Sequence, residues 1–228
     1  MDPFTVVGIV VVVVLSITSH EAAHAWVADR LGDPTARQLG RVTLDPRPHI
    51  DPMMTVILPG FLIISGAPFI FGGAKPVPVQ IAYLNHPRRD WALVGMAGPV
   101  CNFLLAFLLT GLFAALLKIG IWEKDATGSL ILVAGIYANV LLGLFNLLPI
   151  PPLDGSRVIQ YFLHGRALKL YTRLDRYGIF ILVGVLLLAP QLFWGIMVPA
   201  MNYLLDTMTG VFGVQAEVAY ALRTLFFG

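Results

Sequence analysis

Long apolar runs separated by short polar stretches dominate the chain. Five such runs cover residues 4–31, 53–71, 91–117, 130–148 and 179–203. A helix that crosses a lipid bilayer needs about 20 predominantly apolar residues. The first, third and fourth runs therefore predict spanning helices. The last run contains Pro190 and Pro199, and it predicts one span followed by a second short or interfacial helix.

The composition agrees with a membrane location. Hydrophobic residues make up 57% of the 228 residues and charged residues only 12%, whereas a soluble domain carries roughly 25% charged residues. These values exclude a cytosolic enzyme and a disordered protein. The formal charge of +2 is too balanced for nucleic acid as a partner. The single cysteine, Cys101, excludes both a disulfide framework and a cysteine-ligated metal site.

The first apolar run resembles a secretory signal peptide only in part. A signal peptide begins with positive charge, and residues 1–4 contain neither lysine nor arginine. We therefore expect this run to be a retained membrane helix.

The positive charges indicate how the helices are oriented. Twelve of the 15 lysines and arginines lie in residues 30–47, 75–89 and 157–176, and the positive-inside rule places these stretches in the cytoplasm. The first helix then ends inside and the third run begins inside, so the run at 53–71 must start and finish on one side. Its glycines and prolines agree with a re-entrant segment. The alternative is an ordinary helix followed by a short turn.

The clearest candidate chemistry is the sequence HEAAH at residues 20–24. On a helix, His20 and His24 share one face, so their imidazoles can bind one Zn²⁺ while Glu21 acts as a general base. The alternative is a pair of interfacial histidines beside a solvated glutamate. An uncompensated Glu21 at membrane depth would cost about 3 kcal/mol, and a bound metal supplies the compensation.

A catalytic zinc site needs a third protein ligand. The histidine candidates are His49, His86 and His164. Asp154 stands out among the carboxylates because it follows a proline-broken turn directly after the uncharged run at 130–148. Such irregular backbone survives at membrane depth where it is buried or lines a wet cavity. The alternative is that Asp154 caps the following helix.

HEAAH at 20–24 and NLLPIPPLDG at 146–155 together resemble the zinc motifs of the site-2 protease family of intramembrane metalloproteases. Residues 73–79 and 97–102 are also similar to that family's pattern, so the resemblance covers about residues 16–160. The resemblance implies one Zn²⁺ per chain, held by His20, His24 and Asp154, with Glu21 as the general base. It also implies hydrolysis of peptide bonds within or near transmembrane segments of membrane proteins. The chain is most similar to the compact bacterial and archaeal branch without a PDZ module.

The expected fold is an all-α polytopic membrane protein. A three-helix catalytic core, about residues 4–160, is joined by one or two C-terminal helices, a re-entrant segment and a short membrane-associated β segment. Residues 1–210 are expected to form one protease domain, and the tail at 211–228 has no predicted place. The expected location is a prokaryotic cell membrane, with the active site toward the cytoplasmic side.

Substrate contacts can also be predicted. A peptide bond must leave its helix to be cleaved, and its freed backbone groups then need partners. The stretch at 74–81 reads as an extended edge that could clamp such a substrate by strand addition, through Lys75, Val77 and Val79. The alternative is a plain extended connection. Asn102 and Asn146 are candidates for holding the oxyanion or substrate backbone, unless each satisfies backbone groups between helices.

Two other functions fit parts of the pattern. A metal transporter could use HEAAH and Asp154 as a transport site, but no internal repeat of the transporter kind is visible. A degenerate relative that only binds substrates would lack the glutamate or a ligand, and all four residues are present.

Overall fold

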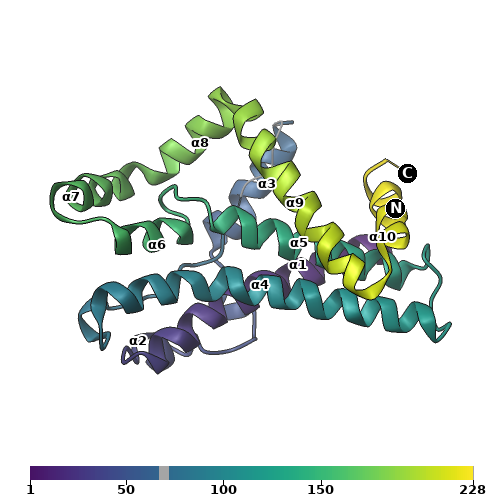
Figure 1. Cartoon of the computed structure of the whole chain (residues 1–228), viewed down its shortest axis with the longest axis horizontal. Helices are drawn as coiled ribbons and strands as arrows, with labels where there is room; N and C mark the ends of the chain where they lie inside the picture. The colour runs from purple at the N-terminus through teal and green to yellow at the C-terminus, as the bar shows by residue number, and fades with distance from the viewer. Residues whose placement is uncertain (67–71, 228) are drawn as a thin grey trace.

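The computed structural model describes residues 1–66 and 72–227. Three long helices form its centre, namely α1 (Pro3–Arg30), α4 (Pro87–Lys118) and α5 (Thr127–Asn146) (Figure 1). Each is long and apolar enough to cross a membrane, so the three predicted spans correspond to three candidate membrane helices. α4 packs against both α1 and α5, and α1 also packs against α5. The described residues are helical and contain no strand.

The first residues of α1 favour a helix start. Asp2 precedes the helix, and its carboxylate accepts hydrogen bonds from the backbone N–H groups of Phe4 at 2.9 Å and Thr5 at 3.0 Å. Pro3 occupies the first helical position, where its fixed φ favours the helix and its missing N–H costs nothing. The helix then continues through the HEAAH residues to Arg30, so the motif lies on regular helical backbone.

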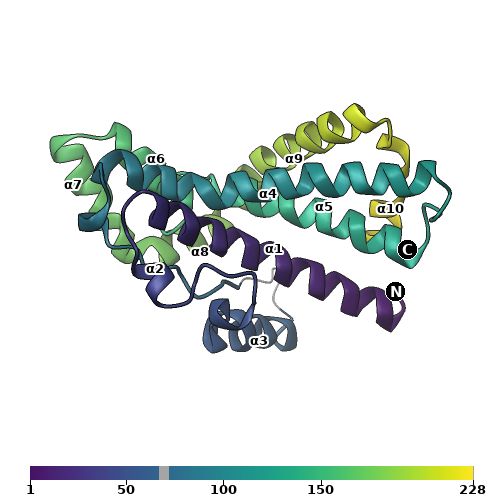
Figure 2. The ribbon, with the colours of Figure 1, turned by 90° about the horizontal axis from the view of Figure 1, so that it is seen from below.

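The shorter helices are distributed over the two ends of this centre. α2 (Thr35–Gln38), α6 (Asp154–Phe162) and α7 (Gly165–Leu174) lie at one end, and both termini and α10 (Gln215–Phe227) lie at the other (Figures 1 and 2). Short 3₁₀ turns cover Arg47–His49, Ile81–Tyr83 and Asp175–Tyr177.

The last apolar run forms two helices in the opposite order from the prediction. The short helix, α8 (Gly178–Leu188), comes first, and the longer α9 (Pro190–Phe212) follows. The chain bends by 91° between the helical stretch Gly165–Leu188 and α9. At 11 residues, α8 is too short to cross a hydrocarbon core of about 30 Å. Pro190 explains the break, because proline lacks the N–H that would continue the α8 ladder and is well suited to starting α9.

Residues 211–227 of the predicted tail at 211–228 pack with the helical core, and residue 228 lies outside the described residues. Gly213 ends α9 in a left-handed conformation with φ of 69°, and α10 then folds back against α5 and α9. Val218 and Ala221 are buried in the same apolar cluster as Phe113 of α4 and Ile136 of α5. Residue 210, the predicted end of the protease domain, lies within α9.

The run expected to be re-entrant is broken into short pieces. A π-helical turn covers Pro52–Ile57 and α3 covers Leu58–Ile64, while residues 67–71 lie outside the described residues. Residue 73, just beyond the run, is adjacent to residue 54 near its start, because the backbone N–H of Gly73 donates to Met54 O at 3.0 Å. The hydroxyl of Thr55 also donates to Gly73 O at 2.7 Å.

The segment predicted to be a short β-strand does not form a strand in this structure of a single chain. Residues 72–80 are irregular and lead into the 3₁₀ turn at Ile81–Tyr83. A strand needs a neighbouring strand, and none lies beside this segment in the described part of the chain. Pro76 and Pro78 also lack the N–H groups that a ladder requires.

Candidate metal centre

The two histidines of HEAAH lie one turn apart on α1 and point to the same place. Their Nε2 atoms are 3.0 Å apart, and their rings meet edge to face with centroids 4.6 Å apart. Both side chains are buried. The i, i+4 spacing therefore produces the convergence that the sequence predicts.

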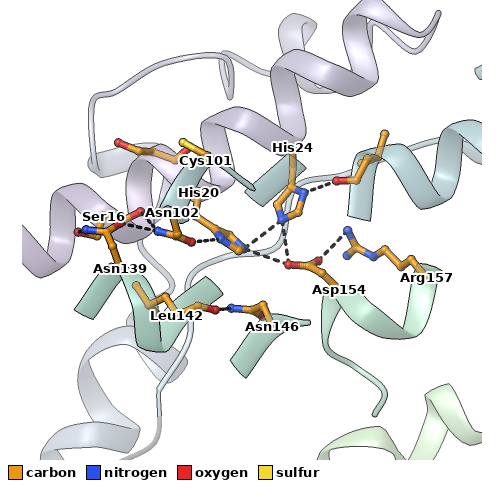
Figure 3. Close-up of polar contacts among 12 residues, drawn as sticks. Ser16, His20, His24, Cys101, Asn102, Asn139, Leu142, Asn146, Asp154 and Arg157 are labelled. Atoms are coloured by element: carbon orange, nitrogen blue, oxygen red, sulfur yellow. Dashed lines mark hydrogen bonds and ion pairs between the residues drawn. The ribbon is translucent and has the colours of Figure 1, made fainter. Parts of the chain in front are cut away.

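Asp154 completes a cluster of three metal-ligand types. Its Oδ2 atom lies 3.0 Å from His20 Nε2 and 3.1 Å from His24 Nε2 (Figure 3). Asp154 is the first residue of α6, after the proline-containing turn that follows α5. Gly155 allows this turn to close, because a Cβ atom there would lie 2.1 Å from the carbonyl oxygen of Leu147.

The side chain of Asp154 does not act as a helix cap. Leu153 occupies the capping position of α6, and no side chain there accepts a backbone N–H. The second carboxylate oxygen of Asp154 instead pairs with Arg157 Nη1 at 3.1 Å. Arg157 in turn stacks over the ring of Trp91 at 4.6 Å from its centroid. The carboxylate is thus held between the two imidazoles and one guanidinium.

Hydrogen bonds fix which nitrogen of each imidazole faces the cluster. His24 Nδ1 lies 2.6 Å from Val94 O, and a carbonyl can only accept, so Nδ1 carries the proton. His20 Nδ1 lies 2.6 Å from Asn102 Oδ1. The amide of Asn102 is oriented by its Nδ2, which donates to Asn139 Oδ1 at 2.8 Å, so Nδ1 of His20 is also the donor. In the neutral imidazoles, both Nε2 atoms therefore present lone pairs to each other and to Asp154.

Three acceptors that meet in this way fit a bound cation. Two imidazole nitrogens and one carboxylate oxygen are typical zinc ligands. Ligand atoms of a tetrahedral zinc site lie about 3.3 Å apart, because each zinc–ligand bond is about 2.0–2.1 Å long. The measured separations of 3.0–3.1 Å are close to that spacing. The donor set therefore fits zinc with one coordination position left for water.

A buried polar chain supports His20 from behind. From Asn102 it continues through Asn139, whose Nδ2 donates to Ser16 Oγ at 2.7 Å (Figure 3). The Ser16 hydroxyl donates to Val12 O at 2.7 Å. The sequence pattern did not single out Asn139, Ser16 or Arg157. A signal existed for Asn139, which is an isolated polar residue within the apolar run at 130–148.

A cavity of about 360 Å³ opens onto the cluster. Glu21, Asn146 and Val77 line its wall together with the three clustered residues. The amide Nδ2 of Asn146 donates to Leu142 O at 3.0 Å. Asn102 lies behind His20 and is not part of this wall. The amide oxygen of Asn102 faces His20 of α1 and its nitrogen donates to Asn139 of α5, while its contact with the oxyanion or substrate stays a prediction.

The other predicted residues lie elsewhere. His49 is buried, and its Nε2 donates to Thr43 O at 3.1 Å. Burial lowers the pKa of its imidazole. His86 and His164 line a separate surface pocket between the ends of α4 and α6. The side chain of Lys75 is exposed, and Val79 packs against a cluster of α1 and α4 residues. None of the three histidines joins the metal cluster found among the described residues.

Gly98 of α4 provides a test of this geometry. A Cβ atom at Gly98 would lie 2.5 Å from the Nε2 atoms of both His20 and His24, so Gly98→Ala must displace both ligands. We expect zinc affinity to fall about 100-fold or more, since a loss of supporting groups alone costs 10–100-fold. Zinc per mole of purified protein measures this effect.

The matched control is Gly195→Ala in α9, where a Cβ atom would meet open space. This variant should keep normal zinc. Full zinc content in Gly98→Ala would mean that α4 does not pack against the two imidazoles as described.

Comparison with known proteins agrees with the chemistry of the cluster. The profile of peptidase family M50 matches residues 122–189. "Putative zinc metalloprotease YwhC" of Bacillus subtilis is 34% identical over 90% of this chain and 92% of its own length. "Putative zinc metalloprotease Rip2" of Mycolicibacterium smegmatis is 32% identical over 83% of this chain and 71% of its own length. No solved structure matches the chain. The chain therefore belongs to peptidase family M50, the site-2 protease family, whose cofactor is zinc.

Proposed function

We propose that this protein is an intramembrane zinc endopeptidase that hydrolyses peptide bonds within or near transmembrane segments of membrane proteins. One observation carries the proposal. His20, His24 and Asp154 meet within 3.1 Å of one another, and Glu21 lines the same cavity. His20, Glu21 and His24 lie on α1, one of the three helices able to span a membrane.

The residues that line the cavity have different roles in peptide hydrolysis. A zinc ion held by His20, His24 and Asp154 would polarise the scissile carbonyl and lower the pKa of a bound water. Glu21 removes the proton of the attacking water and later delivers it to the leaving amine. Asn146 lines the cavity, and its amide can hold the oxyanion or the substrate backbone.

The substrate is a locally unwound segment, because a helix shields its own peptide bonds. The extended segment beside the cavity is anchored near both of its ends. Lys75 N–H donates to His49 O at 2.8 Å, and Gln80 N–H donates to Asp33 Oδ2 at 2.6 Å. Between these anchors, the backbone of Val77 has no hydrogen-bond partner among the described residues. Its N–H and C=O are therefore available to a substrate strand.

The active site opens toward the cytoplasmic side, and the segment at 53–71 is re-entrant. The supporting observation is that α2 and α7, which carry Arg37, Arg166 and Arg173, lie at the same end of the three long helices (Figures 1 and 2). The loop between α4 and α5 lies at the opposite end. The hydrogen bond from Gly73 N–H to Met54 O supports the re-entrant path, because a segment that returns to the side it left brings the residues around its ends together.

Cysteine labelling tests this orientation. In a Cys101→Ser background, a cysteine at Arg88 should react only with a reagent on the cytoplasmic side, and a cysteine at Lys124 only with one outside. Arg88 lies in the first turn of α4 and Lys124 follows the other end of that helix, so the two positions must lie on opposite sides if α4 spans. Labelling of position 88 from outside would reverse the orientation.

Cleavage by the purified protein tests the proposed function. The full chain is placed in vesicles with a single-span membrane protein, and the fragments are identified by mass spectrometry. Cleavage inside or beside the span, stopped by a chelator and restored by zinc, is the expected result. Zinc movement across the vesicle membrane without cleavage would instead assign the cluster to transport.

A further inference from the structure

Arg41 is a buried cation next to the extended segment. It follows the short helix α2, and only 4% of its surface is exposed. Its guanidinium donates to the backbone oxygens of Lys75 and Pro76, the latter at 3.3 Å. Its Nη2 atom also lies 3.4 Å from His49 Nδ1, which accepts because the Nε2 of that ring donates to Thr43 O.

The charge of Arg41 is not explained by an ion pair. No acidic side chain within the described ranges forms a salt bridge with it, and its buried Nε has no hydrogen-bond partner there. Burial lowers the pKa of the guanidinium, and the negative charge of Glu21 opposes this shift. Burying a charge is unfavourable unless other groups compensate it. The compensation for Arg41 comes from neutral acceptors, namely His49 and the backbone oxygens of Lys75 and Pro76.

The two carbonyls that Arg41 binds belong to the segment that forms part of the wall of the active-site cavity. Pro76 and Val77 line the cavity that contains His20 and Glu21. Proline has no N–H, so the segment cannot be fixed through a donor at position 76. Holding its carbonyls is the available way to fix this part of the wall, and a planar guanidinium can reach two of them at once.

We propose that Arg41 is a positioning residue that fixes the register of a substrate strand against the metal centre. It acts through the carbonyls of Lys75 and Pro76, which set where the unpaired backbone of Val77 stands relative to His20 and Asp154. This inference rests on the proposed protease function, and it assigns to Arg41 the choice of which peptide bond is cleaved.

The test compares Arg41→Lys with Arg47→Lys. A lysine keeps the charge, but its ammonium lacks the planar set of donors that lets a guanidinium bond two carbonyls and His49 together. Arg47 is a matched control, because it lies on the same loop in an exposed ion pair with Asp45. We expect Arg41→Lys to keep normal zinc and to lower kcat/KM on the order of 10- to 100-fold, mainly through KM, because small misplacements are costly. Arg41→Lys should also cleave peptide bonds next to the wild-type cleavage site. Arg47→Lys should cleave only the bond that the wild type cleaves.

Other results would overturn the inference. Wild-type KM and a single wild-type cleavage position in Arg41→Lys would show that the residue sets no register. If Arg41→Lys does not fold, Arg41→Gln, which keeps one amide donor without charge, is measured in its place. Failure of both variants to fold would assign Arg41 to loop stability alone. Absence of cleavage by the wild type would contradict the proposed function itself, so the two failures are distinguishable.

Discussion

Glu21→Gln should retain zinc and lose cleavage. Glu21 lines the cavity but is not one of the three residues whose ligand atoms converge. Glutamine has nearly the same size and shape, so the positions of His20 and His24 on α1 should not change. It cannot take a proton from water, and loss of one proton-transfer group costs about 10²–10⁴-fold in rate. Zinc per mole and the rate of fragment release from a single-span substrate measure the two effects separately.

Glu123→Gln serves as the control for this experiment. Glu123 lies in the loop between α4 and α5, at the end of the helices away from α6. Its substitution removes the same charge and should leave both zinc and cleavage unchanged. A cleaving Glu21→Gln variant would require another base, and the assignment of Glu21 would then be wrong.

The local part of the site could be predicted because it depends on helix geometry alone. The apolar run at 4–31 predicts a helix, and the i, i+4 spacing of His20 and His24 then determines that their rings meet. Asp154 is 130 residues from His24 in sequence, and residue chemistry alone left ligand and cap as alternatives. The resemblance of residues 146–155 to a zinc motif favoured the ligand, and the observed contacts agree with it.

The contacts between distant helices could not be predicted in this way. An asparagine in an apolar helix needs a partner, but the sequence does not say whether that partner is substrate or another helix. Asn102 faces α1 and α5 because of how α4 packs, so it supports His20 instead of lining the cavity. Nothing in the sequence distinguishes Arg41 from the other arginines near it, so its burial could not be predicted. Its buried environment arises from three loop segments that the fold brings together.

The break in the last apolar run shows the limit of hydropathy as a predictor. The residues at 179–203 are apolar enough for a span, and Pro190 was visible within them. Hydropathy does not report which side of a proline continues as the longer helix. In the structure the polar stretch after Met201 continues as helix to Phe212 and packs through Leu205 and Thr209, which makes α9 the longer one.

Asp154→Asn and Asp154→Ala should both lose zinc and cleavage. One oxygen of Asp154 faces both imidazoles and the other pairs with Arg157, so the carboxylate is the only anion in the cluster that the structure describes. Loss of a direct ligand should exceed the 10–100-fold reduction in metal affinity that follows when a supporting group is lost. Asparagine keeps the size but removes the negative charge that the site offers to a divalent cation, and we expect it to be nearly as damaging as alanine.

The pair of variants separates this role from helix capping. Asparagine caps a helix about as well as aspartate, whereas alanine costs about 1 kcal/mol of stability. A capping role would thus leave Asp154→Asn nearly normal and would leave zinc bound in Asp154→Ala. Asp175→Asn, an exposed aspartate at the end of α7, is the control for a change of charge near the site. Normal zinc content in Asp154→Ala would move the ligand role to another residue. Because Leu153 holds the capping position and the carboxylate is turned toward His20 and His24, the structure favours joint loss of zinc and activity in both variants.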